Sequence, residues 1–255
     1  MFTIPHDGLA DVAPWFLPER PGPLIFAHAR RFGQGRVVVD RWPEPRLLLA
    51  DAGGGNYALR GDPQVLIEPA ATGIDLAETA GFIDAPPSFE TALRLLDPGL
   101  GRWDRVIAVL PDSVLDASSD SRVRRMTAAD ELAASRLDPE MAWIAGTWGG
   151  PAPLAAAGVA WAAFACGAPI AVAVPFYIGN HYEDIGVVTA PEHRRQGLSR
   201  SCAAAVIADI RARGHTPTWT TSPDNISSLA VAQTLGFIQE RPDVLWGFRT
   251  PIPTG

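Results

Sequence analysis

The residues with the clearest chemical character lie together in one short loop: Arg194, Arg195, Gln196, Gly197, Leu198 and Ser199. A strand pattern precedes this loop and a helical pattern follows it, so the first backbone N–H groups of the helix are free to face a ligand. Gly197 lets the chain approach that ligand closely. Two guanidinium groups before a helix start oppose the helix dipole unless an anion lies there. The loop therefore favours a pyrophosphate site, and the alternative is a basic helix start at the surface.

Two other groups of reactive residues carry less chemistry. His181, Glu183 and His193 lack the i, i+4 or HExxH spacing of a metal site, so no metal is predicted. Cys166 and Cys202 are the only cysteines and form no CxxC pair, which argues against a disulfide framework or a structural zinc. This cysteine usage favours a reducing, cytoplasmic setting.

The elements around the loop follow from its flanking patterns. A strand over 183–189 ends at Ala190-Pro191, and apolar or small residues at helical spacing predict a helix from Leu198 to Gly214. A strand over 216–221, a helix from Asn225 through 235 and a last strand over about 244–249 follow. Upstream, we expect a strand over 122–126, a helix start with Thr127 and Asp130 in a capping box, a short helix over 139–144, and a hairpin of strands 159–166 and 170–177.

The residue patterns in the first part of the chain predict a second unit of mixed α and β structure. Strands are expected over 36–39, 46–49, 56–59 and 106–110, with a helix over 89–96. A polar stretch within residues 112–121 separates the two units, so the proposed domains are 1–115 and 121–255. No spacing in the first domain indicates catalysis.

Composition narrows the class of protein. Hydrophobic residues make up 47% and charged residues 19% of 255 residues, as in a compact globular protein. The net charge of −7 predicts no general attraction to nucleic acid or anionic membranes. Residues 141–182 carry no charged side chain, yet prolines and glycines interrupt them, so core strands are expected in place of a membrane span. The N-terminus lacks the pattern of an export signal.

The loop and its surroundings resemble the GCN5-related N-acetyltransferase (GNAT) superfamily. That family carries Arg/Gln-x-x-Gly-x-Gly/Ala between a strand and a helix, then an Asn and a helix that ends in Leu-Gly-Phe. Here Arg194, Gly197 and Ser199 match the loop, Asn225 the Asn, and Leu235-Gly236-Phe237 the ending, with Ser199 in place of Gly or Ala. The stretches 35–40 and 57–62 also resemble a bacterial branch that includes the zwittermicin-resistance type, which implies a degenerate, cofactor-free GNAT-like domain before the catalytic one.

The resemblance implies a mixed α/β fold with a central sheet flanked by helices, and acetyl transfer from acetyl-CoA to a primary amine of a small molecule by direct attack in a ternary complex. It implies that Glu183 is the catalytic base. Asp184 faces the other way by strand alternation and exchanges roles with Glu183 if the register slips by one residue. The implied cofactor-binding residues, besides the loop at 194–199, are Val187, Val188, Thr189 and Asn225. The tyrosine that usually meets the leaving thiolate is replaced by Ala232, and Tyr177 or Tyr182 are the possible substitutes.

Several questions stay open at this level. A non-catalytic module that senses acyl-CoA is the alternative to an enzyme, and a membrane-associated protein is a third class. The acidic composition favours a cationic amine over an acidic acceptor. No motif identifies the acceptor, and a homodimer is possible.

Overall fold

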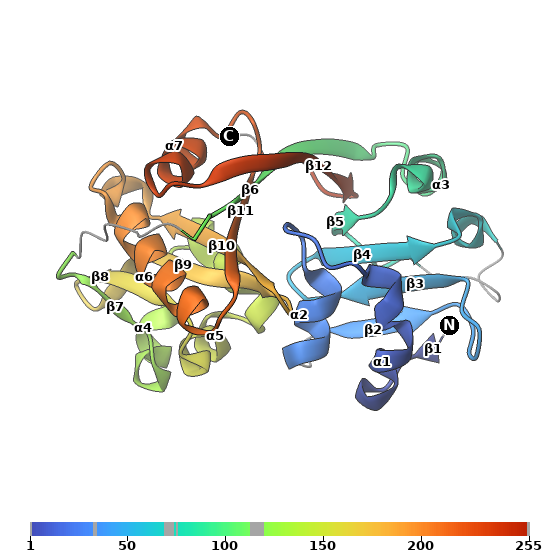
Figure 1. Cartoon of the computed structure of the whole chain (residues 1–255), viewed down its shortest axis with the longest axis horizontal. Coiled ribbons are helices and arrows are strands. Elements are labelled where there is room, and N and C mark those ends of the chain that lie inside the picture. The colour runs from blue at the N-terminus through green and yellow to red at the C-terminus, as the bar shows by residue number, and fades with distance from the viewer. Residues whose placement is uncertain (1, 33–34, 69–73, 75, 113–119, 254–255) are drawn as a thin grey trace.

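The computed structural model describes residues 2–32, 35–68, 74, 76–112 and 120–253, and Figure 1 shows their arrangement. The described strands form one mixed sheet in the order β1-β2-β3-β4-β5-β12-β6-β11-β10-β9-β8-β7. The sheet and its flanking helices confirm the predicted α/β class. The strands of the first part of the chain are β1 (Phe2–Thr3), β2 (Arg36–Val39), β3 (Leu47–Asp51), β4 (Asn56–Gly61), β5 (Gly81–Asp84) and β6 (Gly101–Val109). Those of the second part are β7 (Val123–Arg125), β8 (Trp161–Ala165), β9 (Ala168–Ile178), β10 (Tyr182–Thr189), β11 (Thr216–Thr221) and β12 (Ile238–Phe248).

Seven described α-helices flank the sheet: α1 (Leu9–Val12), α2 (Ile25–Phe32), α3 (Glu90–Leu96), α4 (Glu131–Ala134), α5 (Pro151–Ala157), α6 (Leu198–Ala212) and α7 (Ile226–Thr234). The predicted capping box is present, because Thr127 and Asp130 cap each other's backbone at the start of a 3-10 turn. The predicted short helix over 139–144 is a longer 3-10 helix, η6 (Pro139–Trp148). The pattern of the sequence missed α2 and β5, and it underestimated the lengths of β6 and β12.

In the middle of the sheet, the same succession of strand pairings occurs twice, once in each direction across the sheet. In the second part, parallel β10 and β11 are followed by antiparallel β6 and then β12. In the first part, parallel β4 and β5 are followed by antiparallel β12 and then β6. Each part therefore takes its next strand from the other part. β6 lies in the span proposed as the first domain, yet its neighbours are β11 and β12; most of the proposed linker, 113–119, lies outside the described residues.

The two parts differ in what connects their parallel strands. The helix α6 joins β10 to β11, whereas β4 leads into the short 3-10 turn Pro63–Ile67 before β5. A helix N-terminus that could hold an anion is thus built after β10 and not after β4 within the described residues.

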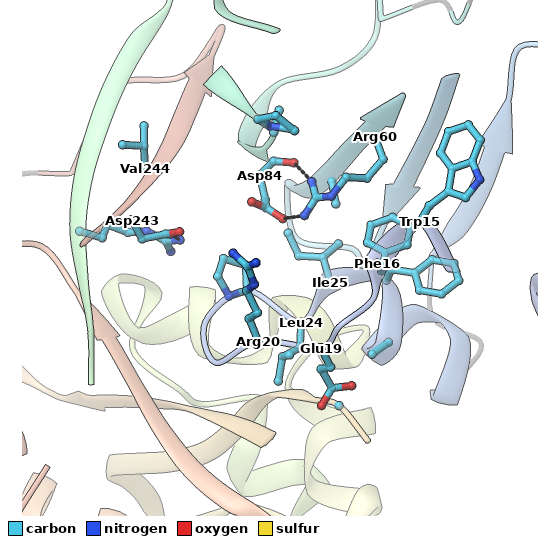
Figure 2. A pocket seen from close by; sticks show the side chains of 18 of the residues that line it. Trp15, Phe16, Glu19, Arg20, Leu24, Ile25, Arg60, Asp84, Asp243 and Val244 are labelled. Atoms are coloured by element: carbon cyan, nitrogen blue, oxygen red, sulfur yellow. Dashed lines mark hydrogen bonds and ion pairs between the residues drawn. The ribbon is translucent and has the colours of Figure 1, made fainter. Parts of the chain in front are cut away.

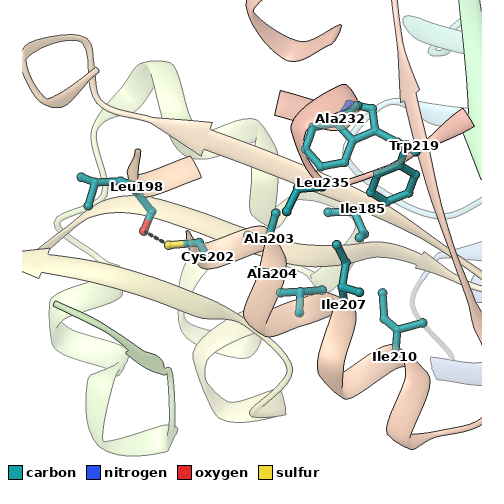
Figure 3. Close-up of a cluster of buried hydrophobic side chains, with 14 of the residues drawn as sticks. Ile185, Leu198, Cys202, Ala203, Ala204, Ile207, Ile210, Trp219, Ala232 and Leu235 are labelled. Carbon is teal, nitrogen blue, oxygen red and sulfur yellow. Dashed lines mark hydrogen bonds between the residues drawn. The ribbon is translucent and has the colours of Figure 1, made fainter. Parts of the chain in front are cut away.

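Helix α6 packs on one face of the sheet against β8, β9, β10 and β11. Its buried side chains meet small residues of β9 and the fully buried Trp219 of β11 (Figure 3). Alanines on this face allow the helix to approach the strands closely. This contact fixes the start of α6 relative to the end of β10.

Several hydrogen bonds attach the N-terminal segment to the second part of the chain, and those of Glu19 and His28 are the most extensive. Glu19 accepts hydrogen bonds of 2.7–3.2 Å from the backbone N–H groups of Asn180, His181 and Tyr182. His28 of α2 is fully buried; its Nδ1 accepts from the Ile178 N–H at 3.1 Å and its Nε2 donates to the Thr147 carbonyl at 2.9 Å. Burial lowers the pKa of His28 to about 4, so it remains neutral and holds this geometry at ordinary pH.

In the described part of the chain, no helix is both long and apolar enough to span a membrane. Residues 141–182, which carry no charge, form part of η6, α5, β8, β9 and the turns between them. The predicted core strands form here, and the region also contains α5, which the sequence pattern did not predict.

Candidate functional site

The parallel strands β10 and β11 separate at the point where the predicted site begins. Their pairing runs from Tyr182 opposite Thr216 to Ile185 opposite Trp219 and then ends, while β10 continues beside β9 to Thr189. β11 continues to Thr221 beside β6. Alternate peptide groups of residues 186–189 therefore face the side that β11 has left. The predicted residues Val187, Val188 and Thr189 lie on this unpaired edge, and both valines are half-buried.

The loop between β10 and α6 presents its basic residues at the surface. Arg194, Arg195, Gln196 and Gly197 are exposed, and Leu198 is buried under the first turn of α6. Arg195 (φ 61°) and Gly197 (φ 76°) both adopt left-handed backbone conformations. Residues with a side chain rarely adopt that backbone conformation, so the positive φ of Arg195 indicates a constrained loop.

The start of α6 has no side-chain cap. Gly197 is the N-cap residue and supplies no side-chain acceptor, and a Cβ at its position would meet no atom within 4 Å. The first N–H groups of the helix thus face open space beside two guanidinium groups. Several predicted ligands have contacts within the protein. Gln196 accepts from Arg122 at 2.9 Å, the Ser199 hydroxyl lies 2.7 Å from that of Thr189, and Arg194 Nε donates to the Thr189 carbonyl at 3.4 Å.

Asn225 begins α7 as its N-cap. Its side-chain oxygen accepts from the Ser228 N–H at 3.0 Å and from the Ser227 hydroxyl at 2.9 Å. The predicted helix start is confirmed. Ala232 is buried in the core beside Trp219, so no polar side chain stands at that position.

Glu183 and Asp184 face opposite sides of the sheet. Glu183 points to the α6 side and is fully buried. Its Oε1 accepts from Arg213 Nε at 2.9 Å and lies 2.8 Å from His215 Nδ1, while its Oε2 accepts from Arg213 Nη2 at 2.6 Å. Both oxygens of the predicted base are therefore engaged by groups at the end of α6.

Asp184 is also buried, but its partners are neutral. The hydroxyls of Thr218 and Thr220 donate to its Oδ1 at 2.7 and 2.8 Å, and its Oδ2 accepts no hydrogen bond from the described residues. Burial raises the pKa of Asp184 to about 6, against the lowering effect of the two hydroxyls and of nearby Arg105. A carboxylate with one free oxygen and a pKa near 6 has the properties of a general base. In the sequence, strand alternation places Asp184 and Glu183 on opposite faces of the strand. It does not show which of the two faces carries the reaction.

A large cleft opens on the Asp184 side of the sheet. It has a volume of about 1310 Å³ and lies between the N-terminal segment, the β6–β12 pair and the β9–β10 turn. Figure 2 shows Asp243 and Val244 on one wall, Trp15, Phe16 and Arg60 on the opposite wall, and Arg20 between them. Sequence reasoning missed this cleft because its walls come from segments far apart in the chain.

Two possible substitutes for the missing tyrosine have structural roles. Tyr177 is buried, its hydroxyl donates to Asn56 Oδ1 at 2.7 Å, and burial raises its pKa well above the ordinary value. Tyr182 is half-buried and packs against the cluster around α2. Among the described residues, no group of three or more His, Cys, Asp or Glu side chains is placed to hold a metal ion.

Comparison with known proteins agrees with this geometry. The family described as GNAT acetyltransferase matches residues 109–243. An uncharacterised N-acetyltransferase in the mutA 5′ region of Streptomyces virginiae is 32% identical over 219 residues, which cover 84% of this chain and 90% of that protein.

Two solved structures share the fold over nearly the whole chain. A GCN5-related N-acetyltransferase-like protein from Streptococcus suis has a TM-score of 0.71 at 17% identity, covering 94% of this chain and 98% of its own. A GNAT-family acetyltransferase from Colwellia psychrerythraea has a TM-score of 0.57 at 14% identity, covering 96% and 97%. With the family match over more than half of its length and this curated relative, the chain belongs to the GNAT acetyltransferase family and is an acyltransferase.

Proposed function

We propose that this protein transfers an acetyl group from acetyl-CoA to a primary amine of a small molecule, by direct attack in a ternary complex. The observation that carries the proposal is the separation of β10 from β11 after Ile185 and Trp219. It leaves unpaired peptide groups between a helix N-terminus on one side and a buried carboxylate on the other. The helix N-terminus and the unpaired peptide groups suit an acyl donor, and the carboxylate suits an amine acceptor.

The residues around the start of α6 fit the diphosphate of coenzyme A. The N–H groups of the first turn and the Arg194 and Arg195 side chains supply positive charge, and the open space at Gly197 admits a phosphate. The unpaired edge at 186–189 fits the extended pantetheine arm, which would accept hydrogen bonds from Val187, Val188 or Thr189. Bound acetyl-CoA supplies an activated acetyl group as a thioester.

Asp184 is the base that the geometry favours. Of the two alternatives that the sequence left open, Glu183 has both oxygens occupied by Arg213 and His215, whereas Oδ2 of Asp184 accepts no hydrogen bond from the residues that the structure describes. Asp184 precedes the last paired residue of β10, so it stands at the point where the strands separate. In this role Asp184 takes the proton of the attacking amine, and Glu183 fixes the end of α6 against β10.

The positions of the helix start and of the cleft support a direct transfer within a ternary complex. The helix start lies at the end of β10 beyond the separation, and the cleft lies on the face of the sheet that Asp184 occupies, so the proposed donor site and the cleft are different places. The chain offers no suitable thiol for an acetylated intermediate on the protein. Burial raises the pKa of Cys202 to about 12, and Cys166 lies in the exposed turn between β8 and β9.

Initial-rate kinetics test the proposal. Thiol release would be followed with acetyl-CoA and a panel of primary amines at several fixed concentrations of each substrate. Intersecting double-reciprocal lines are expected, because both substrates must be bound before transfer; parallel lines would contradict a ternary complex. Saturable binding of acetyl-CoA in calorimetry without thiol release for any amine would instead support a non-catalytic acyl-CoA sensor.

A further inference from the structure

The cleft on the side of the sheet that Asp184 faces differs in charge from the protein as a whole. The described residues that line it include seven arginines and four carboxylates, in a chain whose net charge is −7. Some of these charges neutralise each other, such as Arg60 and Asp84 at 2.7 Å. Arg20 has no carboxylate partner in the described part of the chain. The residue before it, Glu19, is fixed by its hydrogen bonds to the backbone of Asn180 and His181. The cleft therefore carries an excess of positive charge.

The innermost part of this charge is a cluster on β6 and β12. Arg105 and Arg241 share one carboxylate, that of Asp243; Arg105 makes a close ion pair with it, and Arg241 Nη1 lies 3.0 Å from Oδ1. Arg105 is only 7% exposed, and the Asp243 side chain only 9%. Two guanidinium groups on one carboxylate leave a net positive charge at this cluster, in which Arg105 and Asp243 are buried and Arg241 is 32% exposed, and an anion would balance that charge.

The hydrogen bonds of this region show the same imbalance. In the described chain, the buried side-chain polar atoms without a partner are four N–H nitrogens, among them Nε of Arg105 and Nε of Arg241. No buried side-chain oxygen stands in that group. Buried donors without acceptors in a native site indicate a ligand group that accepts hydrogen bonds.

The charges of the cluster reach the proposed base, although Asp184 itself is buried and does not line the cleft. Both Arg105 and Asp243 act electrostatically on Asp184, and Arg105 also acts on Tyr177, the residue paired with Asp184 across β9 and β10. A molecule whose anionic group meets Arg105 and Arg241 would lie on the side of the sheet that Asp184 faces.

We infer that the acceptor of this acyltransferase is a small molecule that carries a carboxylate as well as its primary amine, and that Arg105 and Arg241, with Arg20 at the wall, bind the carboxylate. The inference rests on the proposed function and identifies the class of its acceptor. Guanidinium groups bind carboxylates through paired N–H···O bonds, which supplies both the charge and the missing acceptors. This acceptor differs from the cationic amine that the overall composition favours. The cleft is the better guide, because the local field of a cleft decides recognition at close range.

Matched pairs of acceptors test the inference. Amino acids and their carboxamides, such as L-phenylalanine with L-phenylalaninamide and β-alanine with β-alaninamide, would be compared in the thiol-release assay and by ligand-induced shifts of the melting temperature. The acids are expected to have kcat/KM values at least about tenfold higher than the carboxamides and to produce the larger shifts. In the variants R105Q and R20Q this preference should shrink, while R136Q, at an exposed position outside the cleft, should retain it.

The outcomes separate the inference from the proposed function. Equal kcat/KM values and equal melting shifts for acids and carboxamides would overturn the inference and leave acetyl transfer intact. Acid-selective melting shifts that R20Q weakens, without thiol release for any amine, would support the anion site and contradict the proposed function. If R105Q does not fold, the wild-type acid preference and its loss in R20Q decide the matter, because Arg20 is exposed and can be replaced without disturbing a buried pair.

Discussion

Asp184 combines burial with a free oxygen, and its pKa of about 6 lies close to the pH at which a general base works best. Replacing it with Asn keeps an acceptor for Thr218 and Thr220 but removes the proton acceptor. We expect D184N to lower kcat by about 100-fold. In the wild type, kcat should fall as the pH drops below about 6, because Asp184 is then protonated. The pH profile of D184N should lack this acidic limb, and two amines of different pKa should show the wild-type limb at the same pH.

The same substitution has an opposite effect on stability. The folded-state pKa of Asp184 is raised, so the folded protein binds more protons than the unfolded chain between about pH 4 and 6. The stabilisation from protonated Asp184 is complete below the unfolded pKa and lost as the pH rises through about 6. At pH 8, D184N should therefore be more stable than the wild type by roughly 1–3 kcal/mol, and the difference should vanish near pH 4. Chemical unfolding at both pH values measures this; an equal stability at pH 8 would contradict the burial cost.

Glu183 is expected to act on structure rather than on the proton. Its carboxylate is the common acceptor of Arg213 and His215, and E183Q leaves these two donors with a weaker, neutral acceptor. We expect a loss of roughly 1–3 kcal/mol in unfolding free energy, a smaller decrease in kcat than for D184N, and an unchanged acidic limb. E192Q is the control, since the Glu192 side chain is 66% exposed. Complete loss of turnover in E183Q with unaltered stability and cofactor affinity would identify Glu183 as the base.

At the scale of the element, the decisive feature is the uncapped start of α6. Gly197 has a φ of 76° and open space at its Cβ position. An alanine there costs about 1 kcal/mol of stability because of the left-handed backbone, and its methyl group occupies the space that a phosphate would need. G197A should raise the dissociation constant for acetyl-CoA by about tenfold or more, as measured by calorimetry.

Gly158 provides a matched control for that substitution. It has a φ of 65°, also with no atom within 4 Å of a Cβ, but it ends α5, away from the start of α6. G158A should lose a similar amount of stability and keep its affinity for acetyl-CoA. If both variants bind acetyl-CoA like the wild type, the diphosphate does not lie at Gly197.

The elements also show how far the sequence could be read. The loop at 194–199, the helix α6 and the N-cap Asn225 follow from rules that act over a few residues, so they were predictable. The choice between the two candidate bases was not, because Glu183 and Asp184 differ only in which side of β10 they occupy, and the groups that engage Glu183 come from the end of α6. The pattern of β6 indicates a strand but not its partners, which lie more than a hundred residues further along the chain.

For the whole molecule, the pair β6 and β12 links the two parts of the chain in one sheet. β6 fills the position between β11 and β12; its Ile107 and the next residue after the strand, Leu110, are buried. β12 in turn lies beside β5 and contributes the fully buried Phe248 to the core of the first part. The proposed division at 115 and 121 therefore separates the strand β6 from both of its neighbours, and the two cores are coupled through it.

This coupling predicts different behaviour for two C-terminal fragments. A fragment of residues 121–255 lacks β6, which leaves β11 and β12 without a common neighbour and exposes their edges, so it should be insoluble or unfolded. A fragment of residues 98–255 keeps β6 and should show more secondary structure by circular dichroism and cooperative unfolding. Co-expression of 1–112 with 121–255 should restore a soluble complex, because the first fragment then supplies β6 in trans. A stably folded 121–255 that binds acetyl-CoA alone would show that β6 is dispensable and that the second part is an autonomous domain.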